Sequence, residues 1–472
     1  PRQIAVIAFW PFLEQLLSFF VTSSDLFIAT KIGVDAQDTI NISDGMGAVV
    51  FIMWFGFVIQ GSIMMGATAI VSRMTGARDY PQAQHGLHQA AMLGLLAGTI
   101  SCGLLFTCSD FMVTHVLTMN ETARAYALQY VYMAAFAAPF SGVVFAINAA
   151  LRGSGDTRLP FWIMMSVGIL NVIFSVIFVF ADAPLGGWRI GGIAAGTVCG
   201  YGISMCILLF IMLRRRKKIF TGRKNESLEE LVRERGEHYA PPLYLSFSHL
   251  RPDMGMQKRI LKIGLPQAVE VFGMWGIQMF CLSIISELPV KGVLGVHNIA
   301  VRIESLSFLP GFAIGMAAST LVGQYLGARN ALMARITIWK CMRYAVIFMT
   351  GLGVLFSAFP ALFMEIFSNG STTLIDTGIP VLRTMLVVEP FFAACIVMKM
   401  SLRGAGDTRR VMLISYGIMG FFRVVCTWVW FRLAPETMTL WGIWLVFAFE
   451  MAVQSAILYK IVKGRSWTKL QV

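Results

Sequence analysis

Long apolar runs, separated by short polar segments, follow one another along almost the whole chain. A helix that crosses a lipid bilayer needs about 20 apolar residues, and each run is long enough for one. The pattern predicts twelve transmembrane helices, at residues 4–29, 46–72, 87–107, 126–151, 159–180, 190–213, 260–286, 293–325, 339–364, 377–402, 411–431 and 441–461. The expected fold class is therefore an all-α membrane protein.

The composition also indicates a lipid environment. The 472 residues are 57% hydrophobic and 13% charged, with a mean hydropathy of +0.71. A soluble domain carries about 25% charged residues, because its surface faces water. None of the eight cysteines forms a CxxC pair, and nearly all lie in apolar runs, where a thiol behaves as a small hydrophobe. We expect no disulfide framework, no metal site and no cofactor.

Lysine and arginine are concentrated in the loops on one side of the predicted spans. Positive loop charge marks the cytoplasmic side of a membrane. We therefore expect a protein of the inner cell membrane whose two termini, and the loop after the sixth span, lie on the cytoplasmic side. Residues 214–262 alone hold 13 Lys/Arg against 6 Asp/Glu. The net charge of +13 is thus explained by topology rather than by nucleic-acid binding. The opposite side holds little beyond Lys31, Arg189, Lys291 and Arg432.

The long polar stretch in the middle of the chain separates two sets of six spans. It begins with five consecutive basic residues, 214–218, and contains Pro241-Pro242. We expect an N-lobe at residues 1–213, a cytoplasmic linker at 214–257 and a C-lobe at 258–472. A solvated, positively charged linker explains this composition, and contact with lipid headgroups is the alternative.

The two halves repeat one another in sequence. The segment Leu151-Arg-Gly-Ser-Gly-Asp-Thr-Arg158 returns 251 positions later as Leu402-Arg-Gly-Ala-Gly-Asp-Thr-Arg409. The same offset relates residues 76–78 to 327–329 and Pro139 to Pro390. Both halves hold six spans and begin on the same side, which predicts parallel repeats related by a pseudo-two-fold axis along the membrane normal.

The repeated motif indicates a structural hinge rather than a catalytic site. It ends one helix, turns on glycines and opens the next helix. Asp156 and Asp407 are placed to cap that next helix by accepting backbone N–H bonds. We expect the arginines of the motif at the level of the cytoplasmic headgroups.

These motifs resemble those of the multidrug and toxic compound extrusion (MATE) family, prokaryotic type. The doubled L-R-G-[SA]-G-D-T motif is similar to the family hallmark, and so are residues 76–78, 322–328 and 302–310. The resemblance covers nearly the whole chain. It implies a two-lobe antiporter that expels amphipathic, often cationic small molecules, driven by inward Na⁺ or H⁺. We expect a monomer in the lipid bilayer.

Ionisable side chains at membrane depth cost about 2.5–3.5 kcal/mol to insert, which makes each a functional candidate. Asp25 follows Thr22-Ser23-Ser24 in the outward half of the first span. A lone carboxylate there can bind Na⁺ or accept a proton, because burial disfavours its charged form. It also matches the first-helix aspartate of the family, which implies a cation-coupling role. A structural Asp25, hydrogen-bonded to its Ser and Thr neighbours, is the alternative.

The resemblance implies further members of this N-lobe site. Asn171 on the fifth span and Thr197 on the sixth match residues that the family uses, whereas Ser175 replaces the family's fifth-span aspartate. Together with Asp25 and a backbone carbonyl near Ile193, these side chains still offer several oxygens for Na⁺. The loss of one carboxylate favours H⁺, since a single buried carboxylate can simply be protonated.

Glu270 and Glu389, in the seventh and tenth spans, are candidates for ion or substrate binding in the C-lobe, because some family members carry acidic residues on these helices. Glu389 directly precedes Pro390. The alternative is structural pairing with a basic residue of the same lobe, namely Arg302, Arg383, Lys399 or Arg423. For Glu14 and Glu304 both packing and function stay open, and we interpret Glu450 as a packing contact.

Taken together, these features predict a cation-coupled multidrug antiporter that works by alternating access and has no enzyme activity. A flippase for a lipid-linked or amphiphilic substrate is the nearest alternative. A cleft lined by cationic side chains would favour the flippase, and one lined by methionine and aromatic residues would favour drugs. No HExxH, DDxxD or Ser/His pair supports a membrane enzyme, and two repeats give no ring of filter loops for a channel.

Overall fold

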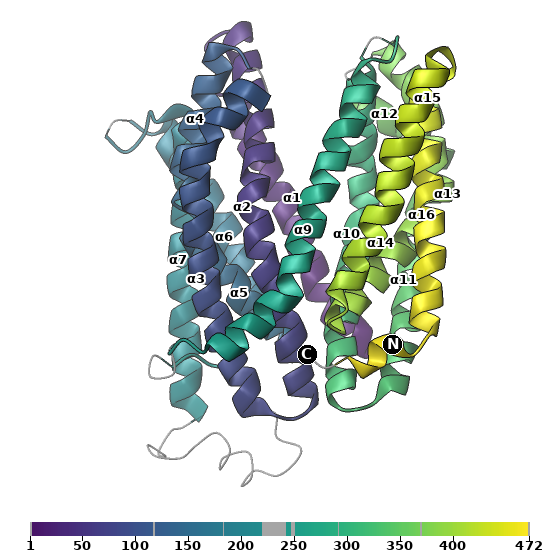
Figure 1. The fold of residues 1–472 in the computed structure, drawn as a ribbon. Coiled ribbons are helices and arrows are strands. Elements are labelled where there is room, and N and C mark those ends of the chain that lie inside the picture. Colours follow the sequence, from purple (N-terminus) through teal and green to yellow (C-terminus); the bar gives the residue numbers. More distant parts are fainter. Residues whose placement is uncertain are drawn as a thin grey trace. The chain divides into compact units, whose positions relative to one another are not determined.

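The computed structural model describes residues 2–116, 119–182, 184–219, 242–246, 251–290, 292–368 and 371–470. Within these ranges all regular secondary structure is helical, with no strand (Figure 1). The chain divides into two compact units. The N-terminal unit is Leu13–Ala268, and the C-terminal unit combines Pro1–Phe12 with Val269–Val472. Most of the linker that we predict at residues 214–257 lies outside the described ranges.

The N-terminal unit is built from long apolar helices joined by short turns. Asp35, Asp79 and Asn120 each accept a backbone N–H at the start of a helix, which satisfies donors that have no partner within the helix. The helices are α1 (Arg2–Thr30) from Leu13 onward, α2 (Ala36–Gly76), α3 (Tyr80–Phe111) with the π-helical turn Met112–Val116, α4 (Glu121–Ala135), α5 (Ala138–Ser154), α6 (Arg158–Phe180), α7 (Arg189–Ile219) and the first part of α9 (Met254–Ser286).

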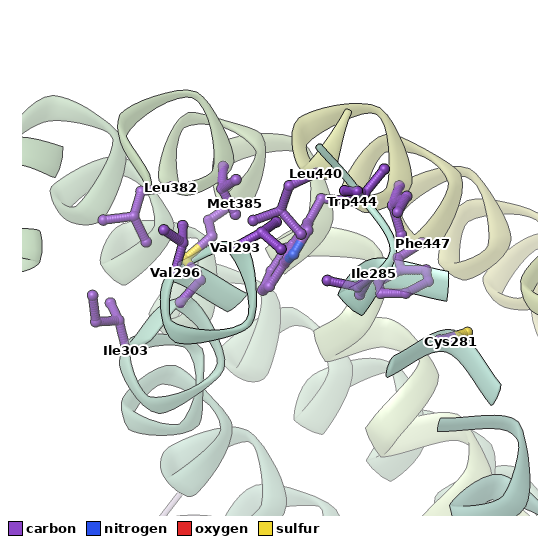
Figure 2. Close-up of a cluster of buried hydrophobic side chains, with 14 of the residues drawn as sticks. Cys281, Ile285, Val293, Val296, Ile303, Leu382, Met385, Leu440, Trp444 and Phe447 are labelled. Atoms are coloured by element: carbon purple, nitrogen blue, oxygen red, sulfur yellow. The ribbon is translucent and has the colours of Figure 1, made fainter. Parts of the chain in front are cut away.

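The C-terminal unit packs its helices around an apolar core. Figure 2 shows this core, in which Val293, Leu382 and Trp444 from three helices meet. The helices after α9 are α10 (Val293–Gly327), α11 (Ala331–Ala358), α12 (Pro360–Ser368), α13 (Thr372–Gly404), α14 (Thr408–Met419), the π-helical η3 (Gly420–Cys426), α15 (Thr427–Leu433), the 3-10 turn Pro435–Thr437, α16 (Leu440–Lys463) and the 3-10 turn Ser466–Lys469.

The described helices match the predicted spans in number. Eleven are long and apolar enough to cross a membrane, and the bent pair α4–α5 makes twelve if it counts as one span. The expectation of one continuous helix at residues 126–151 is wrong, because α4 and α5 meet at an angle of 55°. Pro139 lies in the first turn of α5, where its missing N–H costs nothing. Its repeat, Pro390, lies inside the continuous helix α13.

Glycines on α7 bring this helix close to α6. Gly192, Gly196 and Gly200 recur at every fourth position and face the α6 backbone. A Cβ atom on Gly196 would lie 2.6 Å from the backbone nitrogen of Ser175, closer than real Cβ contacts. Small residues at this spacing let membrane helices approach closely. The approach places Asn171 and Ser175 of α6 against α7.

This packing predicts a loss of stability in Gly196→Ala. We expect a cost of about 1–3 kcal/mol, since the added methyl overfills the contact. Gly103 of α3 is the matched control, because a Cβ there would meet no atom within 4 Å. Gly103→Ala should be neutral or stabilising by up to about 1 kcal/mol. Thermal unfolding of the two purified variants in detergent checks this, and equal melting temperatures would contradict it.

Residues 242–246 of the linker are bound to α3 rather than solvated. Leu243, Tyr244, Leu245 and Ser246 are buried. The backbone N–H of Tyr244 donates to the Gln84 side chain at 3.1 Å, and that of Ser246 donates to His88 at 3.0 Å. Further along, His85 donates to Asp253 and, as the largest influence, holds the pKa of that carboxyl below its usual value. Residues 242–246 therefore belong structurally to the N-terminal unit.

Candidate functional site

A cavity of about 380 Å³ lies among the helices of the N-terminal unit. It brings together three of the predicted site residues, Asp25 of α1, Asn171 of α6 and Thr197 of α7. Most of the remaining wall is apolar or aromatic. The larger side chains on it are Met53, Phe57, Tyr130, Phe145, Met164 and Tyr201.

Asp25 is exposed to the cavity without being held by its neighbours in sequence. The hydroxyls of Thr22, Ser23 and Ser24 donate to backbone carbonyls one turn earlier, at 3.0, 2.8 and 2.9 Å. Oδ1 of Asp25 is buried and has no hydrogen-bond partner among the described residues. A buried oxygen in this condition is costly unless a ligand or a proton satisfies it.

Asn171 and Thr197 form a polar pair on the same cavity. Nδ2 of Asn171 donates to Oγ1 of Thr197 at 2.9 Å, which leaves Oδ1 of Asn171 buried and without a partner within the described ranges. Two acceptor oxygens, one from Asp25 and one from Asn171, are thus available to a ligand in this cavity.

Ser175 does not line the cavity. It is fully buried and donates to the backbone carbonyl of Ile193 at 3.2 Å. Thr197 donates to the same carbonyl at 3.4 Å. The carbonyl that we considered as an ion ligand therefore already accepts two hydroxyl groups, and Ser175 stabilises the contact between α6 and α7.

Two tyrosines and a glutamate are among the cavity groups that were not assigned to it from the sequence. Tyr130 and Tyr201 lie in apolar runs, where an aromatic residue indicates packing as readily as a binding wall. Glu14 also lines the cavity, and both of its carboxylate oxygens lie 3.0 Å from Nη1 of Arg152. The polar residues spaced along one face of the first span were the signal that could have placed Glu14 here.

The acidic residues of the C-terminal unit have different partners from those expected. Glu270 lies 2.9 Å from Arg403 and accepts from Ser415 at 2.6 Å. Glu389 accepts a hydrogen bond from Ser307, and its Oε2 is buried without a partner in the described part of the chain. Glu450 pairs with Arg423 at 2.9 Å, which agrees with a packing role.

The motif arginines Arg152 and Arg403 each pair with a glutamate of the same unit. Both are buried, at 5% and 9% exposure, because each is drawn inward by a glutamate. Asp156 accepts from the Leu159 N–H at 3.3 Å, as expected for a cap. Asp407 occupies the N-cap position of α14, but its side chain accepts no capping hydrogen bond there, so the cap expected at Asp407 is wrong.

No group of three or more His, Cys, Asp or Glu side chains with metal-binding geometry occurs among the described residues. The candidate site is accordingly a small cluster of oxygens in a largely apolar cavity. Such a site suits a proton, a monovalent cation or an organic cation rather than a transition metal.

The MatE family model matches residues 44–177 and 266–429. The chain belongs to this family, the MATE transporters. Its members are transporters and not enzymes. The two matched stretches fall in the two halves that share the repeated motif, and each contains one copy of it.

Relatives and solved structures cover nearly the whole MATE chain. It is 24% identical to a probable multidrug resistance protein NorM of Thermotoga maritima, over 91% of this chain and 86% of that protein. It is 22% identical to the multidrug resistance protein NorM of Vibrio cholerae, over 90% and 87%. An outward-facing multidrug resistance MATE transporter aligns with a TM-score of 0.83 at 16% identity, over 99% and 96%. A transporter of the MOP superfamily from Pyrococcus furiosus, described as having a binding pocket of reverse polarity, aligns with the same TM-score, identity and coverage. These structures share the fold.

Proposed function

We propose that this MATE transporter is a multidrug efflux antiporter that exports amphipathic cations in exchange for H⁺. The observation that carries the proposal is the buried, unpartnered Oδ1 of Asp25 on the wall of a methionine- and aromatic-lined cavity. An incoming proton and an organic cation both satisfy this carboxylate, so they compete for it. Competition of this kind links the two fluxes if the ion binds the two transport states differently.

The lining of the cavity supports the substrate class. Its volume of about 380 Å³ lies in the range of small-molecule sites. The rings of Phe57, Tyr130 and Phe145 offer π-faces to a flat cation, an attraction of about 0.5–2 kcal/mol per contact. The described lining contains no lysine or arginine, which favours a drug over the anionic lipid-linked substrate of a flippase. The relatives named as multidrug resistance proteins are consistent with this choice.

The oxygens near Asp25 support H⁺ over Na⁺ as the coupling ion. Sodium would need several oxygens to replace its water shell, as hard cations do. Ser175 is not part of the cavity lining, and the Ile193 carbonyl is already shared by two hydroxyls. A single carboxylate with one amide oxygen is sufficient for a proton and a poor cage for Na⁺.

The proposed transport cycle is alternating access in a monomer with two lobes, residues 1–213 and 258–472, joined by the linker at 214–257. Both termini are cytoplasmic in this proposal. In one state the cavity is open to the cytoplasm and binds the drug. In the other it is open outward, where a proton replaces the drug on Asp25. Glu270 and Glu389 are proposed as secondary ion or substrate contacts of the C-lobe.

Transport by the purified protein in proteoliposomes tests the function. We expect ethidium, a cationic aromatic dye, to be exported when a pH gradient is imposed in Na⁺-free buffer. Empty liposomes and liposomes with the gradient collapsed are the controls. Export that requires a Na⁺ gradient and ignores the pH gradient would contradict the choice of ion. Absence of export under either gradient would contradict the antiporter.

The orientation is tested by labelling single cysteines in a cysteine-free background. Ser466 and Leu185 are both exposed and lie on opposite sides in the proposed topology. A membrane-impermeant maleimide added to intact cells should modify Leu185→Cys and leave Ser466→Cys unmodified until the cells are opened. The reverse pattern would contradict cytoplasmic termini.

Ser175→Asp should increase the Na⁺ dependence of transport. It restores a second carboxylate where the family has one, next to the Asn171–Thr197 pair. We expect the apparent Na⁺ affinity to rise about tenfold, which corresponds to about 1.4 kcal/mol. Ser175→Asn is the matched control, because it adds nearly the same volume without charge. An equal response of both variants to Na⁺ in the ethidium assay would show that size and not charge is responsible.

A further inference from the structure

An ion pair joins α1 to the helix that carries the repeated motif. Nη1 of Arg152 on α5 lies 3.0 Å from both carboxylate oxygens of Glu14. Both side chains are nearly inaccessible, at 6% and 11% exposure. Removing one partner of a buried pair leaves the other charge uncompensated, so this contact resists displacement of α1.

Glu14 lies on the same face of α1 as Asp25. Eleven residues separate them, which is close to three helical turns and about 16 Å. Ser18 and Val21 lie between them and line the same cavity. A rotation of α1 that displaced Glu14 would turn Asp25 by a similar angle. The ion pair therefore fixes the direction in which Asp25 faces.

Other features of α1 leave it deformable around these two residues. The hydroxyls of Thr22, Ser23 and Ser24 bond to backbone carbonyls one turn earlier, an arrangement that often bends helices. Pro11, just before Glu14, removes one backbone hydrogen bond from the helix. Because Oδ1 of Asp25 has no hydrogen bond to hold it, the direction of this side chain depends on the contacts that fix α1.

The C-terminal unit contains a second pair of the same kind. Arg403 repeats Arg152 at the offset of 251 and lies 2.9 Å from Glu270 on α9, the first helix of the second repeat. The position that repeats Glu14 is Leu265, not Glu270. In both halves the motif arginine thus pairs with a glutamate of the first helix, but the two glutamates stand at positions that do not correspond in the repeat. A functional need for this ion pair explains its presence in both halves better than descent from one ancestral glutamate position.

We propose that Glu14 and Arg152 are positioning residues, which hold α1 so that Asp25 faces the cavity where ion and drug bind. This proposal rests on the coupling role proposed above for Asp25. Arg152 itself contacts neither ligand. The repeated motif then has a function in the N-terminal unit beyond ending a helix: its arginine sets the direction of the coupling carboxylate.

A double-mutant cycle with Asp25 tests the proposal. Ethidium binding is measured on the whole purified protein for Glu14→Gln, Asp25→Asn and the double variant. We expect Glu14→Gln to weaken binding at least about threefold in the native background and to have no further effect in Asp25→Asn, since coupled residues do not add. Equal losses in both backgrounds would overturn the proposal, because a residue that is merely structural weakens both alike.

A second measurement does not depend on transport. Dicyclohexylcarbodiimide modifies protonated carboxyl groups in membranes, and mass spectrometry reports its rate at Asp25. We expect Glu14→Gln to change this rate at least about threefold, and Arg152→Lys, which keeps the charge, to change it less. Asp110→Asn breaks an exposed ion pair outside the cavity and is the control, with the native rate expected. An unchanged rate in Glu14→Gln would overturn the positioning role.

The two proposals can fail separately. If Asp25→Asn transports ethidium normally, the coupling role of Asp25 is wrong, and the carbodiimide rate still decides whether Glu14 positions it. If Asp25→Asn is inactive while Glu14→Gln alters neither binding nor the carbodiimide rate, the coupling role stands and the positioning role is wrong.

Discussion

We expect Asp25→Asn to abolish gradient-driven ethidium export in proteoliposomes and to leave ethidium binding detectable. Asparagine keeps the shape and the hydrogen-bonding capacity of the side chain but cannot exchange a proton. The aromatic wall of the cavity, including Phe57 and Tyr130, is unchanged and still binds the dye. The driving ion then has no site whose affinity differs between the two transport states, so its gradient cannot drive export of the dye. We expect export to fall to the rate in empty liposomes.

The control for Asp25→Asn is the same substitution at Asp110. Asp110 pairs with Arg124 at 2.6 Å, and its side chain is 51% exposed, outside the cavity. Asp110→Asn should transport like the native protein. Undiminished export by Asp25→Asn would remove Asp25 from the mechanism. Loss of both export and ethidium binding in Asp25→Asn would instead make Asp25 a substrate residue alone.

The spans could be predicted because they depend on local sequence. Twenty apolar residues form a helix in lipid whatever they pack against, since the backbone has no other hydrogen-bond partner. The cap at Asp156 is equally local. The bend between α4 and α5 was missed, although Pro139 was noted, because Pro390 at the repeat position leaves α13 continuous. Proline permits a bend, and the neighbouring helices decide whether it forms.

The partners of the buried charges could not be predicted, because they depend on how each helix is rotated. Glu270 had several arginines and lysines within the same half, and the structure pairs it with Arg403 of the motif. A change of one residue in register turns a helical side chain by about 100°. The candidate oxygens of Asp25, Asn171 and Thr197 came from the resemblance to a family, and the cavity brings these three together.

Glu450→Ala should cause a large loss of stability in the C-terminal unit. Glu450 is fully buried on α16, and Oε2 lies 3.0 Å from Nε and 2.9 Å from Nη2 of Arg423. Without it, Arg423 keeps a buried charge with one weak contact, to Gln278 at 3.5 Å, and a position over the Phe447 ring. Breaking a buried pair costs about 3–5 kcal/mol. We expect little folded protein in the membrane.

Two variants separate the loss of an ion pair from the loss of side-chain volume. Arg423→Met combined with Glu450→Leu removes both charges and fills a similar volume, and it should regain most of the lost stability, since apolar pairs often replace buried ion pairs without cost. Asp110→Asn breaks the exposed pair with Arg124 and should cost less than about 1 kcal/mol. Thermal unfolding in detergent compares all of them. A cost for Glu450→Ala as small as that for Asp110→Asn would mean that Arg423 finds another partner or water. Arg423 lies in the π-helical segment η3, where the wider turn gives the backbone room to shift. If Glu450→Ala is tolerated in this way, we expect the backbone of η3 to be the part that moves.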